Sequence, residues 1–182
     1  MEVDEAIEAA IHAGLGGVVL TEHNYLRRDN ADLSAIAAGR VTVLVGMEIN
    51  CAEGHFLVFG LPDDSGLSYE MPVRILLELA ADAGAAVAAA HPYRWNEAQG
   101  VACFSLALDA VEIASNNTSD EAGRKARRLA SAIGATTIEC SDAHAPEVVG
   151  RWWTELPDGI VTIGQVAEAL KARSHPANPL FV

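Results

Sequence analysis

Hydrophobic residues recur along the chain in two patterns, one typical of helices and one typical of buried strands. Val3, Ile7, Ile11 and Leu15 have the spacing of one face of a helix. A short, continuously apolar run with β-branched residues follows from Gly17, and similar runs return further along the chain. The pattern therefore predicts helices that alternate with buried strands.

The same pattern extends almost to the C-terminus. It predicts strands that begin at residues 17, 41, 55, 86, 110 and 136, and a final short strand at 179–182. Further helices are predicted over 29–38, 72–84, 119–133 and 162–172. The last of these has capping-box spacing between Thr162 and Gln165. Because strands that are apolar throughout are usually parallel and covered by helices, we expect a parallel α/β fold in a single domain, residues 1–182.

The composition narrows the range of partners. Hydrophobic residues make up 51% of the 182 residues, enough for one full core, and the net charge is −13 at pH 7. Such a charge repels phosphate backbones and anionic membranes, so nucleic acid is a poor candidate partner. A small anionic substrate stays compatible with this charge, because a bound metal ion can reverse the local field.

The chain has no sign of export or membrane insertion. No apolar run reaches the roughly 18 residues that a membrane span needs, and the acidic N-terminal segment lacks the basic start of a signal peptide. Cys51, Cys103 and Cys140 are widely spaced and form no CxxC motif. Reduced thiols explain this spacing better than a disulfide framework, so we predict a cytoplasmic protein.

Side chains with imidazole or carboxylate groups follow the apolar runs. His23, Glu48 and His91 each come at the end of such a run, and Asp142 and His144 come after another. The C-terminal ends of parallel barrel strands meet on one face, which holds the active site. Imidazole and carboxylate are ligands that suit Zn, Mn or Fe. One polar residue after a strand is ordinary turn chemistry, but agreement among four strand ends predicts a metal site.

Two further details concern the ligand set. Asp142 and His144 are two residues apart, so on an extended segment both side chains point the same way. His55 begins an apolar run instead of ending one. Its position leaves two interpretations open, a metal ligand or a buried structural histidine.

Five short motifs occur in an order that resembles the PHP family, named for its polymerase and histidinol-phosphatase members. The resemblance runs from about Val3 to Glu155, nearly the whole chain. The motifs are TEHN (21–24), GMEI (46–49), GHFLVFG (54–60), AHPYR (90–94) and CSDAH (140–144). The resemblance implies a distorted (β/α)7 TIM-like barrel with two or three divalent metal ions, Zn, Mn or Fe, that hydrolyses phosphoesters.

The resemblance also implies roles for single residues. Glu48 corresponds to a carboxylate that bridges metals, and Asp142 to a ligand that shares one metal with it. The histidines correspond to two further pairs of ligands, His23 with His144 and His55 with His91. Glu48, Asp142 and His144 are the candidates for catalysis.

Three residues are candidates for substrate binding. Arg94 follows the His-Pro pair and suits a substrate phosphate. Asn116, beside Asn117, ends the apolar run from residue 110, and Arg151 is a weaker phosphate-binding candidate. A surface arginine and turn asparagines are the alternatives for these positions.

The sequence departs from the family pattern in one important respect. Family members begin with a strand that carries His-x-His, whereas this sequence starts at the following helix and contains no such motif. Either a longer native chain has been shortened, or this is a natural short form without catalysis. A barrel that lacks a strand has an open seam, so we expect a homodimer through this seam or pairing of the seam by the 179–182 segment.

The function expected from the sequence is hydrolysis of a small phosphomonoester or phosphodiester by water that bound metals activate. One alternative is a PHP-like domain that serves binding or assembly without catalysis. A second is a metal-dependent amidohydrolase, because fold and ligand types do not fix the reaction.

Overall fold

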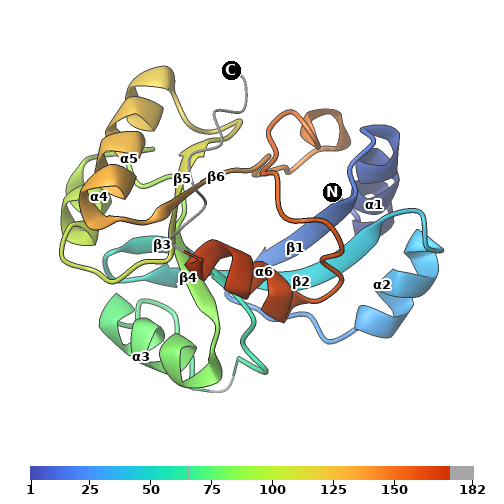
Figure 1. Ribbon diagram of the computed structural model, residues 1–182, viewed down its shortest axis with the longest axis horizontal. Coiled ribbons are helices and arrows are strands. Elements are labelled where there is room, and N and C mark those ends of the chain that lie inside the picture. The colour runs from blue at the N-terminus through green and yellow to red at the C-terminus, as the bar shows by residue number, and fades with distance from the viewer. Residues whose placement is uncertain (65, 173–182) are drawn as a thin grey trace.

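The described part of the chain, residues 1–64 and 66–172 of a computed structural model, alternates helices and strands (Figure 1). In chain order the elements are α1 (Val3–His12), β1 (Gly17–His23), α2 (Asn30–Ala37), β2 (Thr42–Cys51), β3 (Gly54–Phe59), α3 (Val73–Ala83), β4 (Ala86–Ala89), α4 (Ala98–Cys103), β5 (Ala110–Ala114), α5 (Asp120–Ile133), β6 (Thr136–Glu139), the 3-10 helix η1 (Pro146–Val148) and α6 (Ile163–Lys171). The elements predicted for these residues are confirmed. The short helices α4 and η1 were not predicted, because so few residues show no helical period. The strand predicted at 179–182 lies outside the described residues.

The helices begin and end where local chemistry dictates. The Ser119 side chain accepts a hydrogen bond from the backbone N–H of Ala122 and caps α5, which stops at Gly134 in a left-handed conformation. Thr162 and Gln165 form the predicted capping box of α6. Among the described helices none combines the length and the apolar character that crossing a membrane requires.

The six strands of the sheet lie in sequence order, from β1 to β6. The pair β1–β2 is parallel, as are β4–β5 and β5–β6, but β3 is antiparallel to both of its neighbours. The expectation of an all-parallel sheet is therefore wrong for β3. The reason is the connection, since β2 ends at Cys51 and β3 begins at Gly54. A parallel connection needs a dozen or more residues. The two residues between β2 and β3 can therefore form only a hairpin.

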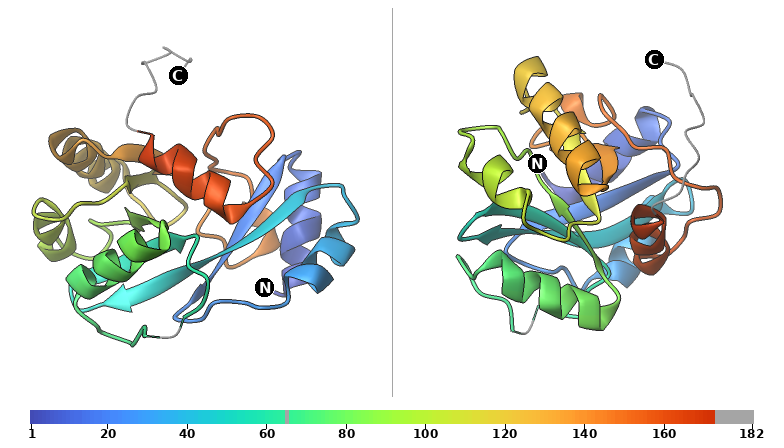
Figure 2. Two further views of the ribbon diagram at one scale, coloured as in Figure 1. Left: turned by 60° about the horizontal axis from the view of Figure 1, so that its bottom comes forward. Right: turned by 60° about the vertical axis from the view of Figure 1, so that its left-hand side comes forward.

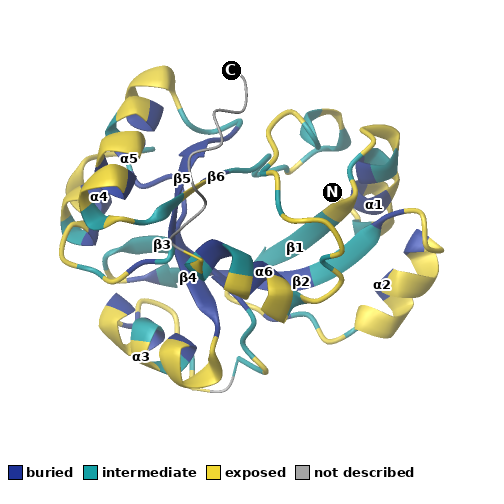
Figure 3. Cartoon of the chain, in the orientation of Figure 1, coloured by how far each residue is buried: buried dark blue, intermediate teal, exposed yellow. Residues whose placement is uncertain are grey.

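The sheet divides the core into two layers, because successive strand residues point to opposite faces. The strands β4 and β5 are buried along their whole length (Figure 3). Phe56 and Val58 of β3 face a core shared with α1, α2, α3 and α5. Leu57 and Phe59 face the opposite way and pack with Val166, Ala167 and Leu170 of α6. The helix α6 thus closes one face of the sheet, and the other helices cover the opposite face.

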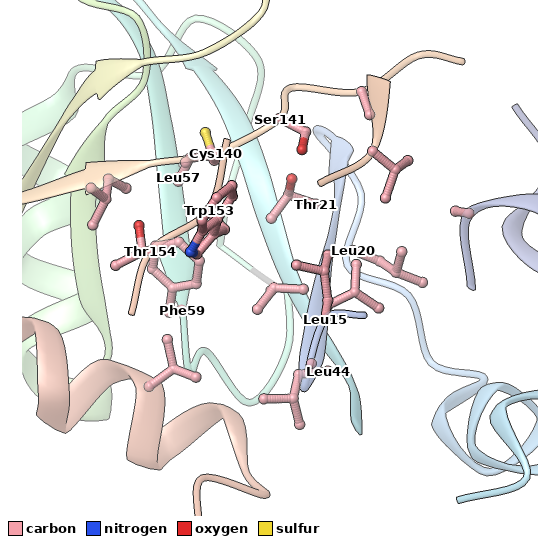
Figure 4. A pocket seen from close by; sticks show the side chains of 18 of the residues that line it. Leu15, Leu20, Thr21, Leu44, Leu57, Phe59, Cys140, Ser141, Trp153 and Thr154 are labelled. Atoms are coloured by element: carbon pink, nitrogen blue, oxygen red, sulfur yellow. The ribbon is translucent and has the colours of Figure 1, made fainter. Parts of the chain in front are cut away.

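The sheet curls into a half-barrel and does not close (Figure 2). Within the described residues β1 pairs only with β2 and β6 pairs only with β5, so each keeps one open edge. A cavity of about 710 Å³ opens between them, with Leu20, Leu44, Leu57 and Phe59 in its wall (Figure 4). The seven-stranded barrel is therefore not confirmed, and the homodimer through the open edge stays a prediction.

Candidate metal centre

The predicted ligands come together at one edge of the sheet. His23, the last residue of β1, lies opposite Glu48 of β2 in the parallel register. In the antiparallel register of β3, His55 lies opposite Asn50, near the end of β2. The backbone N–H of Ala90 donates to the carbonyl of His55, which brings His91 to the same edge. Antiparallel pairing thus explains how a histidine at the start of a strand joins residues at the ends of others.

Four residues form what we call the Glu48 group: Glu48, His23, His55 and His91. The His55 Nδ1 atom lies 2.6 Å from Glu48 Oε1, and His91 Nε2 lies 3.5 Å from the same oxygen. His23 Nε2 lies 3.7 Å from Glu48 Oε2. One carboxylate therefore contacts three imidazoles. The side chains of Glu48 and His91 are only 6% and 2% exposed, whereas that of His23 is 48% exposed.

Burial and charge shift the pKa values in this group. Burial raises the pKa of Glu48, but hydrogen bonds to His55 and His91 and the charge of His23 outweigh it, so the pKa falls to about 2. Burial lowers the pKa of His91, but Glu48 and the neighbouring Glu112 raise it above its ordinary value. A bound metal cation would supply positive charge beside the anionic Glu48 in place of the proton on His91.

The donor set fits a divalent metal ion. Ligand atoms of His23, Glu48 and His55 all lie within 4.8 Å of one another. The buried Nδ1 atom of His91 has no hydrogen-bond partner among the described residues. Leaving a buried polar atom unpaired is costly, and a bound metal ion or a substrate atom would remove that cost. Nitrogen and carboxylate ligands together suit Zn, Mn or Fe.

Two predicted ligands have a positive φ, a conformation that costs energy for residues other than glycine. His91 has φ 31° and Asp142 has φ 45°, in the region where Asn, Asp and His occur more often than other L residues. Such strain gathers at functional sites and persists only where the surrounding structure holds it in place.

A second set of residues follows the neighbouring strands, and we call it the Asp142 group: Asp142, Arg94, Asn117 and His144. Asn117 donates from Nδ2 to Asp142 Oδ2 at 2.6 Å, and Arg94 Nη1 lies 3.4 Å from the same oxygen. His144 Nδ1 lies 3.8 Å from Asp142 Oδ1. The rings of His144 and His23 are 6.2 Å apart between centroids, so the two groups adjoin.

The structure puts the three predicted substrate-binding residues in different settings. Arg94 faces Asp142 at the site. The Asn116 side chain donates to the backbone carbonyl of Ser141 and so ties the end of β5 to the segment that carries Asp142. Arg151 is exposed after η1. Contact of any of the three with substrate stays a prediction.

Sequence reasoning missed two residues that support the histidines. The buried side chain of Gln99, on α4, donates to the backbone carbonyls of His55 at 2.7 Å and Ala90 at 3.1 Å. It lies so close to Gly54 that a Cβ there would sit 2.3 Å from it. Trp95 packs against the rings of His55 and His91. Trp95 lies only four residues after His91, so its closeness to that ligand could have been inferred from the sequence. Gln99 could not be linked to the site in this way, because α4 was not predicted.

The fold and site together define an α/β protein with a candidate metal centre at one sheet edge. The family described as PHP-associated matches residues 120–174, which begin at the start of α5. No match appears among the curated proteins.

Two solved structures share the fold. One is a two-domain protein from Bacteroides vulgatus ATCC 8482, named as containing a predicted PHP-like metal-dependent phosphoesterase. Its TM-score is 0.64 and its sequence identity 22%, and the similarity covers 80% of this chain and 48% of that one. The chain thus spans about half of the Bacteroides protein. The other, from Bifidobacterium adolescentis ATCC 15703, is named as a candidate metal-dependent phosphoesterase, with a TM-score of 0.62 and 15% identity over 92% of this chain and 90% of that one. These similarities show that the chain shares its fold with proteins named as metal-dependent phosphoesterases, and the family match adds a PHP-associated segment over residues 120–174.

Proposed function

We propose that this chain is a metal-dependent phosphoesterase that hydrolyses a small phosphomonoester or phosphodiester. The observation that carries the proposal is the contact of one buried carboxylate, Glu48, with three imidazoles at the sheet edge. The Asp142 group beside it adds a second carboxylate and a guanidinium. The neighbours named as phosphoesterases agree with this reaction class.

The residues have two roles, holding metal and acting on substrate, and Asp142 takes part in both. His23, Glu48, His55 and His91 would hold one or two divalent ions, with Asp142 and His144 as ligands beside them. A divalent ion there would polarise the phosphoryl group and lower the pKa of a water in the site.

The Asp142 group supplies the remaining chemistry. The Asp142 side chain is 10% exposed and fixed by Asn117, so it can orient the attacking water and accept its proton. As the water oxygen bonds to phosphorus, the bond from phosphorus to the leaving oxygen breaks, and the proton passes to that oxygen. Arg94 can turn from Asp142 to the phosphoryl oxygens and neutralise their charge.

The test begins with metal content. The purified 182-residue chain is incubated with Mn or Zn, desalted and measured by elemental analysis, in parallel with its Glu48→Gln variant. We expect at least one retained equivalent in the native chain and less in the variant.

A substrate screen then decides the reaction. Aryl and alkyl phosphomonoesters, phosphodiesters, amides and cyclic amides are tested with the metal-loaded chain. Phosphoester hydrolysis that a chelator abolishes would support the proposal. Hydrolysis of amides alone would show an amidohydrolase, and a chain that holds no metal and hydrolyses nothing would be a binding or assembly domain.

A further inference from the structure

We propose that Trp95 is a stacking surface for the leaving group, and that the site therefore prefers phosphoesters whose leaving group is planar and aromatic. This inference rests on the proposed function, because it concerns the substrate of the same site. The starting observation is that the Trp95 indole is largely exposed, so packing in the core does not explain its presence.

Trp95 is a large apolar residue on the outside of the molecule, 61% exposed. Its ring lies 5.0 Å from that of His55 and 5.3 Å from that of His91, centroid to centroid, and meets both nearly edge-on. Tryptophan is on average among the more buried residues. In the same short segment, by contrast, the aromatic side chain of Tyr93 is partly buried and packs against the core. The indole instead leaves most of its surface open to solvent beside the two histidines.

The position of Trp95 suits the leaving group of a phosphoester. A phosphate held at the Glu48 group lies against His55 and His91, and its leaving group starts one bond beyond phosphorus. That group therefore reaches the region next to an indole that touches both histidines. An aromatic ring there can stack on the indole, and stacking on an aromatic side chain depends on the presence of a π-face more than on the identity of the ring.

Arg94 joins the two ends of such a substrate. Its guanidinium carbon lies over the Trp95 ring, 4.7 Å from the centroid. Its Nη1 atom also reaches towards Asp142 Oδ2, at 3.4 Å. Two consecutive residues thus offer a cation for the phosphate and an aromatic surface for the group attached to it.

The test compares two phosphonates that cannot be hydrolysed at phosphorus. Phenylphosphonate and methylphosphonate are titrated by calorimetry into the Mn-loaded 182-residue chain and its variants. We expect the native chain to bind phenylphosphonate about tenfold more tightly, the scale of one stacking contact. Trp95→Ala should lose this preference and Trp95→Phe should keep most of it.

Two further variants separate stacking from other roles. Arg94→Ala should weaken both phosphonates by a similar factor, because it removes a contact with phosphate. Phe104→Ala removes another exposed aromatic side chain, 51% exposed and at the end of α4, and should change neither affinity.

The outcomes distinguish this inference from the proposed function. Equal binding of both phosphonates by the native chain, or equal weakening of both in Trp95→Ala, would overturn the stacking role and leave the phosphoesterase proposal standing. The second result would show that the indole merely shields the histidines. Failure of the native chain to bind either phosphonate would overturn both proposals.

Discussion

The Glu48 group and the Asp142 group lie side by side, but the fold holds them in different ways. Three of the four residues in the Glu48 group belong to neighbouring strands, and its central carboxylate is 6% exposed. The residues of the Asp142 group follow β4, β5 and β6 in loops, and the His144 side chain is 68% exposed. The first group is fixed by sheet register, and the second by hydrogen bonds between loop residues.

This difference predicts how each group should respond to substitution of the residues around it. Sites built on strands are positioned more accurately than sites on loops, because backbone pairing fixes each Cα. Loop residues depend on supporting contacts such as the bond from Asn117 to Asp142. We therefore expect the Glu48 group to hold metal more tightly, and the Asp142 group to be more sensitive to its neighbours.

The largest effect should follow from Glu48→Gln. The variant keeps the side-chain volume but removes the charge that three histidines contact. Loss of a residue that only supports a ligand typically costs 10- to 100-fold in metal affinity, so loss of this ligand should cost more than about 100-fold. Competition with a fluorescent chelator measures the change. Glu78→Gln, an exposed carboxylate on α3, is the control, and equal losses in the two variants would contradict a specific role.

The pH dependence of stability should come next, measured on metal-free protein. Because the folded-state pKa of Glu48 is about 2 and its ordinary value 4.5, its contribution is fully present above pH 4.5 and lost as pH falls towards 2. The difference corresponds to about 3 kcal/mol in the free energy of unfolding. The raised pKa of His91 acts oppositely, since its contribution is present below pH 6.5 and lost as pH rises through the folded value.

Urea unfolding at pH values above and below these limits checks both signs. Stability of the native chain should be greatest between about pH 4.5 and pH 6.5 as far as Glu48 and His91 are concerned. Glu48→Gln should flatten the fall on the acid side. An equally steep fall in the variant would assign the acid sensitivity to other carboxylates.

Asp142→Asn should have a smaller effect on metal than Glu48→Gln. We expect the weaker of two metal equivalents to lose affinity by 10- to 100-fold, while the tighter equivalent stays within about threefold. Titration with Mn followed by electron paramagnetic resonance counts the two equivalents separately. Loss of both equivalents to the same degree would show that the groups form one inseparable site.

The smallest effect should follow from Asn117→Ala, which leaves both carboxylates in place. Removing its bond to Asp142 Oδ2 should weaken the second metal equivalent by about tenfold or less. Asn117→Asp keeps the shape but places a second negative charge 2.6 Å from Asp142, so it should behave differently. If Asn117→Ala binds both equivalents as the native chain does, Asp142 needs no such support.

The sequence predicted the Glu48 group more completely than its surroundings. Residues at the ends of apolar runs, such as His23 and Glu48, were identifiable because strand ends converge in any parallel arrangement. From its position alone His55 was ambiguous, and only the family resemblance made it a ligand. Its place depends on β3 running antiparallel, which the short link after Cys51 indicated. Gln99 acts on backbone carbonyls that are remote in sequence, and no local pattern marks such contacts.

The β2–β3 hairpin has a consequence for the order in which the site is assembled. Glu48 and His55 are seven residues apart, whereas Asn117 and Asp142 are 25 apart and Arg94 and Asp142 are 48 apart. Hairpins close within microseconds, and ribosomes add about 5 to 20 residues per second. A nascent chain therefore carries the carboxylate and its nearest imidazole in a closable loop for several seconds before residue 142 is synthesised.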